Sequence, residues 1–294
     1  MKFFPTPLIR QLDQYTIEHE PIASVELMER AAEALYREII SSFPELQSLC
    51  VLAGQGNNGG DALALARMML NTGYDVSVFL VHTNRLSPDC EKNKARLLAE
   101  YPHALTEITE VFVEPTTSSE TILVDGIFGS GLSRPTEGIF AQAIEWINRS
   151  KCRVVSIDIP SGLQGEENSA TAGFPIVKAS LTLSLQFPKL AFLLPENEAF
   201  VGRWKVLGIG IHPRAIEETP SNLYFTEKED TTHLLKKRLK FSHKGRHGHG
   251  CIISGSRGMG GASVLASKAA LRSGAGLVTV HGPECNRVIV QTAV

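Results

Sequence analysis

The sequence predicts an α/β protein whose parallel, doubly wound sheet has helices on both faces. Short apolar runs rich in Val, Ile and Leu alternate with longer amphipathic segments over residues 49–208. This alternation is typical of parallel sheets that are covered on both sides. Several of the apolar runs end in turns that contain Gly, Asn, Asp or Ser. Since open sheets of this kind bind ligands beyond the carboxyl ends of their strands, we expect a Rossmann-like sheet with a site at that edge.

Composition narrows the class of protein. The chain has 294 residues, 43% hydrophobic and 20% charged, enough for one large domain or one domain and part of another. Its formal net charge of -2 gives no electrostatic case for nucleic acid or a membrane surface as partner. No apolar run has the length of a membrane span, and the N-terminus does not resemble a secretory signal. Five scattered cysteines without a CxxC pair favour reduced thiols and a cytoplasmic location.

The elements follow from periodicity. The segment up to about Phe43 is expected to be helical, since apolar residues recur near the helical period and Ser24 suits a helix start. Further helices are expected after Asp61, at Pro88–Glu100 and at Ile139–Arg149. Strands are expected at Leu49–Ala53, Asp75–Val81, Thr121–Asp125, Arg153–Asp158, Leu181–Gln186 and Trp204–Gly208.

The stretch Ala53–Leu70 joins the first of these strands to a helix through a turn with four glycines. Backbone N–H groups and a helix N-terminus in such a layout can hold a phosphate or diphosphate. The turn fits neither GxGxxG nor the P-loop, and an ordinary turn is the alternative. Asn57, Asn58 and Asp61 place three oxygen-bearing side chains within five residues, which suits ribose hydroxyls, a hard cation, or both.

Two further strand ends carry polar motifs. Asp125 closes one Val/Ile-rich run and precedes GIFGSGLSRPTEG, while Asp158 closes another and precedes IPSG with Ser161. A carboxylate at the end of a buried strand is costly unless it is paired or binds something. Helix capping, an Asx-turn or a simple turn serine are the alternatives. Because three such ends are harder to explain as turns than one, we expect them to form a single site.

The composition changes beyond about His212. We expect a first domain at 1–213, a polar linker at 214–240 and the beginning of a second α/β domain at 241–294, where strand, glycine loop, helix and strand follow one another. A single βαβ unit cannot bury its own faces. The histidines at 243, 247 and 249 lack the spacing to Cys or carboxylate that would complete a zinc site.

The chain resembles bifunctional NAD(P)H-hydrate repair enzymes. These join an NAD(P)H-hydrate epimerase domain to an ADP-dependent dehydratase domain of the ribokinase-like fold. The epimerase resemblance covers roughly residues 1–213 and is carried by five motifs. They are LMERAA (Leu27–Ala32), AGQGNNGGD (Ala53–Asp61), VDGIFGSGL (Val124–Leu132), SIDIPSG (Ser156–Gly162) and Phe187–Ile211. The segment from His243 onward is similar to the opening of the dehydratase domain.

The resemblance implies a substrate, NADH or NADPH hydrated at C6 of the nicotinamide ring (NADHX or NADPHX), whose R and S epimers the enzyme interconverts. It also implies a potassium ion in the epimerase site, ADP or ATP for the dehydratase domain, and a homodimer or larger homo-oligomer. The potassium ligands it implies are Asn58, Asp125 and Ser161. The substrate-binding residues it implies are Asn57, Asn58, Gly59, Gly60, Asp61, Gly129, Ser130, Gly131, Leu132, Ser133, Arg134, Pro135, Asp158 and Ala262.

The chemistry of the residues agrees with this resemblance. Inverting C6 requires that a bond there breaks and reforms, either by loss of hydroxide to an iminium or by opening of the ring, and both routes stay open. Either route benefits from a nearby carboxylate, so Asp158 is the expected catalytic acid/base. The sequence leaves the choice between NADHX and NADPHX open, since Arg134 could contact a 2′-phosphate or form a surface salt bridge.

Two further expectations concern activity. The glycine-rich anion hole and catalytic aspartate of the dehydratase pattern are not found in this sequence, so no dehydratase activity is expected of this chain, although the full-length form is expected to have it. The alternative to an enzyme is a non-catalytic dimerisation or nucleotide-binding scaffold on the same Rossmann-like fold. Such a scaffold would be expected to lose NNGGD or the aspartate of DIPSG, and this chain has both.

Overall fold

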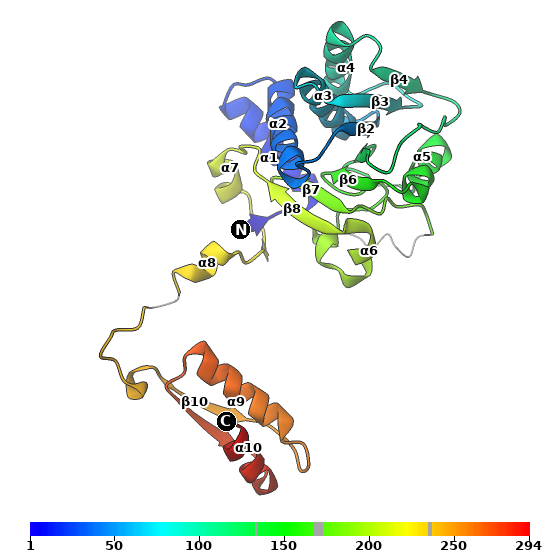
Figure 1. Ribbon diagram of the computed structural model, residues 1–294. Coiled ribbons are helices and arrows are strands. Elements are labelled where there is room, and N and C mark those ends of the chain that lie inside the picture. Colours follow the sequence, from blue (N-terminus) through cyan, green and yellow to red (C-terminus); the bar gives the residue numbers. More distant parts are fainter. Residues whose placement is uncertain (133, 167–172, 235–236) are drawn as a thin grey trace. The chain divides into compact units, whose positions relative to one another are not determined.

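The computed structural model describes residues 1–132, 134–166, 173–234 and 237–294, which form two compact units, Met1–Phe225 and Thr226–Val294 (Figure 1). The first unit contains a seven-stranded sheet in the order β4-β3-β2-β5-β6-β7-β8, and all its neighbouring strands are parallel. Its strands are β2 (Ser48–Ala53), β3 (Asp75–Val81), β4 (Leu105–Ile108), β5 (Ile122–Gly126), β6 (Arg153–Ile157), β7 (Leu181–Leu185) and β8 (Arg203–Leu207).

The doubly wound sheet expected from the sequence is confirmed. The chain runs from β2 outward to β3 and β4, then returns to the other side of β2 and continues through β5 to β8. The winding therefore reverses between β2 and β5, where ligands bind in sheets of this type. The edge strand β4 was not predicted, because it has only four residues and two of them are exposed.

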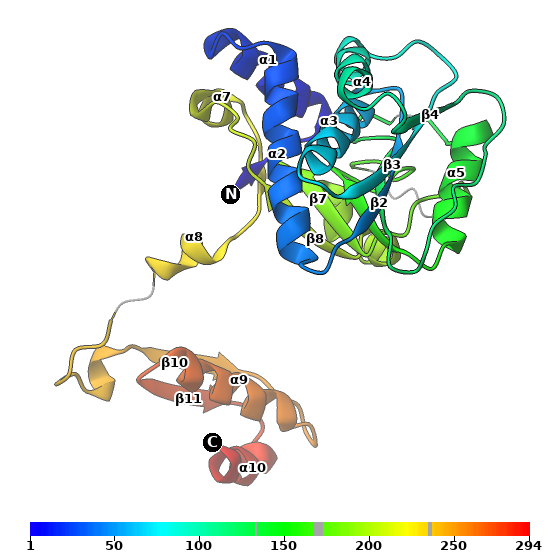
Figure 2. The same ribbon diagram turned by 45° about the horizontal axis from the view of Figure 1, so that its top comes forward.

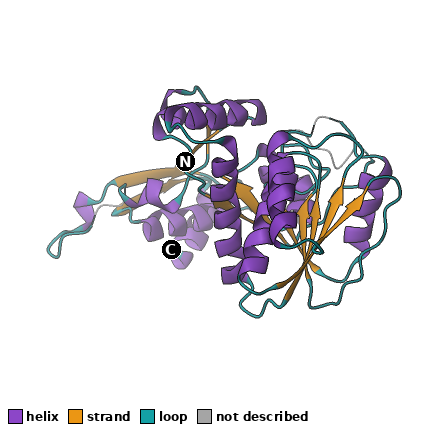
Figure 3. Cartoon of the chain, turned by 90° about the horizontal axis from the view of Figure 1, so that it is seen from above, coloured by secondary structure: helices purple, strands orange, loops and turns teal. Residues whose placement is uncertain are grey.

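Helices cover both faces of this sheet (Figure 3). One face carries α2 (Ser24–Ser42), α3 (Asn57–Asn71) and α4 (Pro88–Glu100), which contact one another (Figure 2). The other face carries α5 (Gly138–Arg149). Because alternate residues of a strand point to opposite faces, Val51 of β2 joins the core under α3, while Leu52 joins the core under α5.

The expected helical N-terminal segment forms two helices. The first, α1 (Thr6–His19), ends just before Pro21, and α2 begins at Ser24 as the sequence indicates. Proline cannot donate a backbone hydrogen bond, so it separates the two helices. The backbone N–H of Ala23 donates to the Glu26 carboxylate (2.9 Å), which secures the start of α2.

The first unit extends beyond residue 213, where the sequence placed the start of a linker. It includes α7 (Pro213–Glu218), which contacts α1, and β9 (Leu223–Tyr224), which pairs antiparallel with β1 (Lys2–Phe3). Ala215 is buried there beside Phe3 and Phe4. The structure therefore assigns residues 214–225 to the first unit. Its remaining elements are η2 (Leu190–Leu193), η3 (Pro195–Asn197) and α6 (Glu198–Val201).

The second unit is a βαβ motif with short flanking helices. Strands β10 and β11 are parallel, and α9 connects them. Its elements are α8 (Lys228–Thr232), η4 (Lys244–Arg246), β10 (His249–Ile253), α9 (Gly261–Ser273), β11 (Leu277–His281), η5 (Glu284–Asn286) and α10 (Arg287–Ala293). Within the described parts of both units, we find no helix with the length and apolar character needed to span a membrane.

Candidate active site at the strand ends

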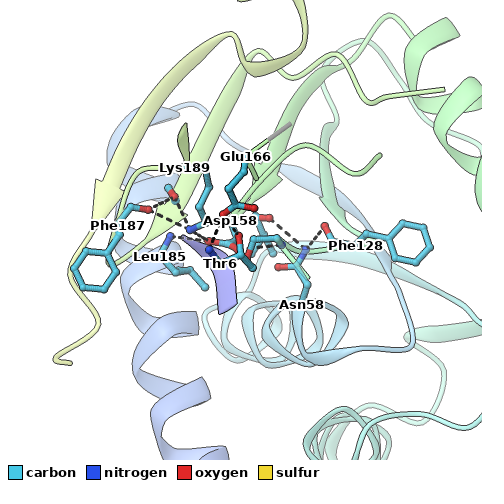
Figure 4. A network of polar contacts seen from close by, with 11 residues as sticks. Thr6, Asn58, Phe128, Asp158, Glu166, Leu185, Phe187 and Lys189 are labelled. Atoms are coloured by element: carbon cyan, nitrogen blue, oxygen red, sulfur yellow. Dashed lines mark hydrogen bonds and ion pairs between the residues drawn. The ribbon is translucent and has the colours of Figure 1, made fainter. Parts of the chain in front are cut away.

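Asn58 connects the three polar strand ends. It lies in the first turn of α3, and its Nδ2 donates to the carbonyl oxygens of Phe128 (2.9 Å) and Ile157 (3.3 Å). Phe128, which Figure 4 shows beside Asn58, belongs to the turn after β5. Ile157 is the last residue of β6. The structure thus brings the turns after β2, β5 and β6 together at the edge where the winding reverses.

The turn that carries Asn58 depends on close backbone contact. A Cβ at Gly59 would overlap the carbonyl oxygen of Gly54, and a Cβ at Gly54 would overlap that of Ile127. Glycine at these two positions therefore lets the first turn of α3 approach the end of β5. Gly60 and Asp61 are also buried, whereas Asn57 is exposed at the helix start.

Asp125 is fully buried and accepts four hydrogen bonds. Oδ1 accepts from the Ser161 hydroxyl (2.5 Å) and the N–H of Ile127 (3.3 Å), and Oδ2 accepts from the N–H of Ser161 (2.9 Å) and the Ser156 hydroxyl (2.8 Å). Burial raises the pKa of Asp125, and the hydrogen bonds from Ser161 and Ser156 oppose that rise. The Ser161 hydroxyl also accepts from the N–H of Phe128 (2.8 Å), so Asp125 fixes the turns after β5 and β6 together.

Asp158 follows β6 directly and has a left-handed backbone, with φ of 65°. The strand expected at Arg153–Asp158 therefore ends one residue earlier, because this conformation cannot continue a strand. The Asp158 side chain forms an ion pair with Lys189 (Oδ1–Nζ 2.6 Å) and accepts from the N–H of Leu185 (3.2 Å). Its Oδ2 accepts a longer bond from the N–H of Ser130 (3.4 Å), in the glycine loop after β5.

Lys189 is a site residue that the sequence did not single out. Only 2% of the residue is exposed, and its ammonium group donates to three acceptors, which are Asp158 Oδ1, the Ser184 hydroxyl (3.2 Å) and the Phe187 carbonyl (3.1 Å). Figure 4 shows this ammonium group beside the Asp158 carboxylate. The signal available in the sequence was a single cation within the apolar run FPKLAFLL, because a buried lysine needs a partner.

Two more site residues come from α1. Burial raises the pKa of Asp13 to about 6, and the charge of Asp158 adds to the effect while Lys189 and Arg10 oppose it. The Arg10 guanidinium lies against Gly131, where a Cβ would overlap Nη2. Burial also raises the pKa of Asp61 well above its usual range, and the charges of Asp158, Asp13 and Asp89 add to this rise. The carboxyl groups of Asp13, Asp61 and Asp158 thus interact electrostatically with one another, and the buried Lys189 lies beside Asp158.

The other residues implied by the resemblance differ in exposure. Gly129, Ser130 and Leu132 are half-buried, while Gly131, Arg134 and Pro135 are exposed. Ser133 lies outside the described residues. Ala262 is exposed in the first turn of α9, in the second unit. In the part of the chain that the structure describes, no three His, Cys, Asp or Glu side chains gather into a metal-binding group.

Two family models match this chain. The model described as YjeF-related protein N-terminus matches residues 24–191, and the model described as NAD(P)H-hydrate dehydratase matches residues 250–294. The crystal structure of yeast ynu0, YNL200c, is similar with a TM-score of 0.57 and 21% identity, and the match covers 70% of this chain and 87% of that chain. At this identity the likeness concerns the fold alone.

Curated relatives agree with these matches. The bifunctional NAD(P)H-hydrate repair enzyme Nnr of Coxiella burnetii is 34% identical over 272 residues, which cover 92% of this chain and 54% of the relative. An NAD(P)H-hydrate epimerase of Lentilactobacillus buchneri is 36% identical over 204 residues, which cover 69% of this chain and 92% of the relative. The chain spans about half the length of the bifunctional relatives that it matches.

The family match at residues 24–191 covers more than half of the chain and contains Asn58, Asp125, Asp158 and Lys189. The chain therefore belongs to the family of the YjeF-related protein N-terminus.

Proposed function

We propose that the first unit is an NAD(P)H-hydrate epimerase, which interconverts the R and S epimers of NADHX and NADPHX. The observation that carries this proposal is the position of Asp158, a carboxylate 9% exposed at the strand ends with Oδ2 directed to the glycine loop after β5. A carboxylate held next to a nucleotide-binding loop can transfer a proton at the hydrated ring. The Lentilactobacillus relative, which is named an NAD(P)H-hydrate epimerase, supports the same activity.

The substrate is proposed to lie across the edge between β2 and β5. Backbone N–H groups of the 129–132 loop and the start of α3 suit the diphosphate, since helix N-termini and glycine loops bind anions. Asn57 and Asp61 of the first turn of α3 offer hydrogen-bonding groups for ribose hydroxyls. Arg10 adds a positive charge at Gly131, and the nicotinamide end is then placed against Asp158.

Asp158 can serve either route to inversion. In ring opening, Oδ2 takes the proton of the C6 hydroxyl group, C6=O forms, and the C6–N1 bond breaks with its electron pair moving to N1. In the other route, the protonated carboxyl group gives its proton to the leaving C6 hydroxyl, water departs, and the N1 lone pair forms the iminium. Return of the bond on the opposite face of C6 gives the other epimer, and Asp158 transfers the proton in reverse.

Asn58, Asp125 and Ser161 are proposed to hold a potassium ion. The Ser161 hydroxyl contacts both the Asp125 carboxylate and the Phe128 carbonyl, and the Asn58 amide contacts the same carbonyl through Nδ2. A carboxylate, a hydroxyl and an amide are hard oxygen donors of low total charge, which suits a monovalent cation. A half-turn of the Asn58 amide would bring its oxygen to the Phe128 carbonyl, and two facing oxygens need a cation between them. When bound, potassium would supply positive charge near the substrate and order the three turns.

The test is epimer interconversion of purified R-NADHX by the whole chain, followed by chromatography of the two epimers, in potassium and then in sodium. We expect rapid equilibration in potassium, slower equilibration in sodium, and a loss of roughly 100-fold or more in rate for Asp158→Asn. Glu114→Gln, which removes an exposed ion pair with Arg149, is the matched control and should keep the wild-type rate. A folded wild-type chain without interconversion would refute the epimerase and favour a binding scaffold.

For the second unit, we propose that it takes part in an ADP-dependent (S)-NAD(P)HX dehydratase activity of the whole protein, with ADP or ATP as cosubstrate and Ala262 near the substrate. The match of residues 250–294 to the dehydratase family supports this.

We also propose that the protein is cytoplasmic and forms a homodimer or a larger homo-oligomer. The five free cysteines suit a reducing compartment, and light scattering on the purified chain tests the assembly.

A further inference from the structure

Lys189 is buried and its ammonium group is fully hydrogen-bonded, unlike that of a lysine at the surface. An ammonium group has three N–H donors, and all three have acceptors, at Asp158, Ser184 and Phe187. A cation placed in this way is held in one position by the fold. It touches the proposed catalytic carboxylate directly, while its low exposure keeps it away from bound substrate.

The ion pair makes the two oxygens of Asp158 unequal. Oδ1 accepts from Lys189 and from the N–H of Leu185, at 2.6 and 3.2 Å. Oδ2 accepts only one bond among the described residues, the long one from the N–H of Ser130 at 3.4 Å. One oxygen is therefore anchored, and the other faces the loop proposed to bind the nucleotide.

The backbone around the ion pair supports a functional arrangement. Asp158 and Gln186 both have left-handed φ, at 65° and 61°. Such a conformation is costly for residues other than glycine, and conformations of this kind cluster at functional sites. The two turns wrap around the ion pair, because Leu185 donates its N–H to Asp158 and Phe187 accepts from Lys189.

We infer that Lys189 is the positioning residue of the epimerase, which anchors Asp158 through Oδ1 so that Oδ2 transfers the proton at the substrate. This inference rests on the proposed epimerase function. Lys189 acts through Asp158, since it holds the carboxylate in place and balances its negative charge. Asp13 and Asp61 also interact electrostatically with Asp158, and both are acidic. Arg10 lies nearby, against Gly131, but among the described residues the ion pair found for Asp158 is the one with Lys189.

The experiment measures kcat and KM of epimerisation for Lys189→Met in the whole chain. We expect kcat to fall roughly 100-fold, within the range of general acid–base catalysis, and KM to stay within about threefold of wild type because uniform substrate binding is retained.

A double variant separates positioning from a general structural role. If Lys189 acts through Asp158, then adding Lys189→Met to Asp158→Asn should cause no further loss of rate. Arg67→Met is the matched control, because Arg67 is a largely buried cation paired with Glu29 (2.5 Å) away from this site, and it should leave kcat unchanged.

The outcomes are distinct. A wild-type rate for folded Lys189→Met overturns this inference and leaves the epimerase standing, whereas an inactive wild-type chain overturns the epimerase itself. Circular dichroism checks folding. If Lys189→Met fails to fold, Ser184→Ala removes one acceptor of the ammonium group but keeps the charge. We then expect a loss of about threefold to tenfold in kcat with KM retained, and an unchanged kcat would overturn the inference.

Discussion

Two loops in this chain have the same order of strand, glycine-rich turn and helix, but their surroundings differ. In the first unit, β2 ends at Ala53 and α3 begins at Asn57, and in the second, β10 ends at Ile253 and α9 begins at Gly261. β2 lies buried between β3 and β5. β10 pairs with β11 alone within the described residues, and its alternate side chains are exposed.

The polar residues of the two loops make different contacts. Asn58 reaches the ends of two other strand–turn segments, at Phe128 and Ile157. Ser263 of α9 is also buried, yet its hydroxyl donates to the carbonyl of Ser254, which directly follows its own strand β10 (2.8 Å). A strand, a turn and a helix N-terminus are thus local features, whereas the proposed active site requires the ends of neighbouring strands.

The largest expected effect tests the backbone contacts of the two turns. Gly59→Ala should lower the free energy of unfolding of the first unit by about 3 kcal/mol or more, because the new Cβ would overlap the Gly54 carbonyl. Gly261→Ala is the matched change in the second loop, where a Cβ meets nothing within 4 Å, and it should be neutral or stabilise by up to about 1 kcal/mol. Urea unfolding measures both, and equal effects would contradict the comparison.

The raised pKa of Asp13 predicts that the free energy of unfolding of the first unit depends on pH. The pKa of Asp13 is raised from 3.8 to about 6, chiefly by burial and by the charge of Asp158. As the pH rises between these values, the unfolded chain releases its proton before the folded chain does. The free energy of unfolding should therefore fall, by up to about 3 kcal/mol, and Asp13→Asn should remove that part of the fall.

The measurement for Asp13 is urea unfolding at a series of pH values between about 4 and 6. Asp75→Asn provides the matched control, since Asp75 is exposed at the start of β3 and the change should leave the slope as in the wild type. A slope that persists in Asp13→Asn would assign the effect to another group.

The smallest expected effect belongs to the second loop. Ser263→Ala removes the hydrogen bonds with Ser254, which should cost roughly 1 kcal/mol of local stability. Faster amide hydrogen exchange in α9, with exchange in α3 unchanged, is the expected readout. Faster exchange in α3 as well, or unchanged exchange in both helices, would mean that Ser263 does not secure its own βαβ motif.

The site residues differ in how far the sequence could indicate them. Asp125 and Asp158 close apolar runs, and Asn58 and Ser161 stand in turns that follow such runs. The rule for parallel sheets was therefore enough to bring them together. Arg10, Asp13 and Lys189 have no such signal, because α1 and the segment after β7 reach the sheet edge only through tertiary contacts. The same reason explains why β1 and β9 were missed, since each has two residues and they pair across the length of the first unit.

The sequence by itself determined the order of the main strands and helices, because burial on two faces requires continuous apolar runs and amphipathic helices. It also determined which polar side chains stand at the strand ends. Only the tertiary structure decided that Lys189 anchors Asp158, that α1 brings Asp13 and Arg10 to the same edge, and that residues 214–225 belong to the first unit. These features depend on charges and hydrogen bonds between residues far apart in the chain, and such pairs leave no periodic pattern in a single sequence.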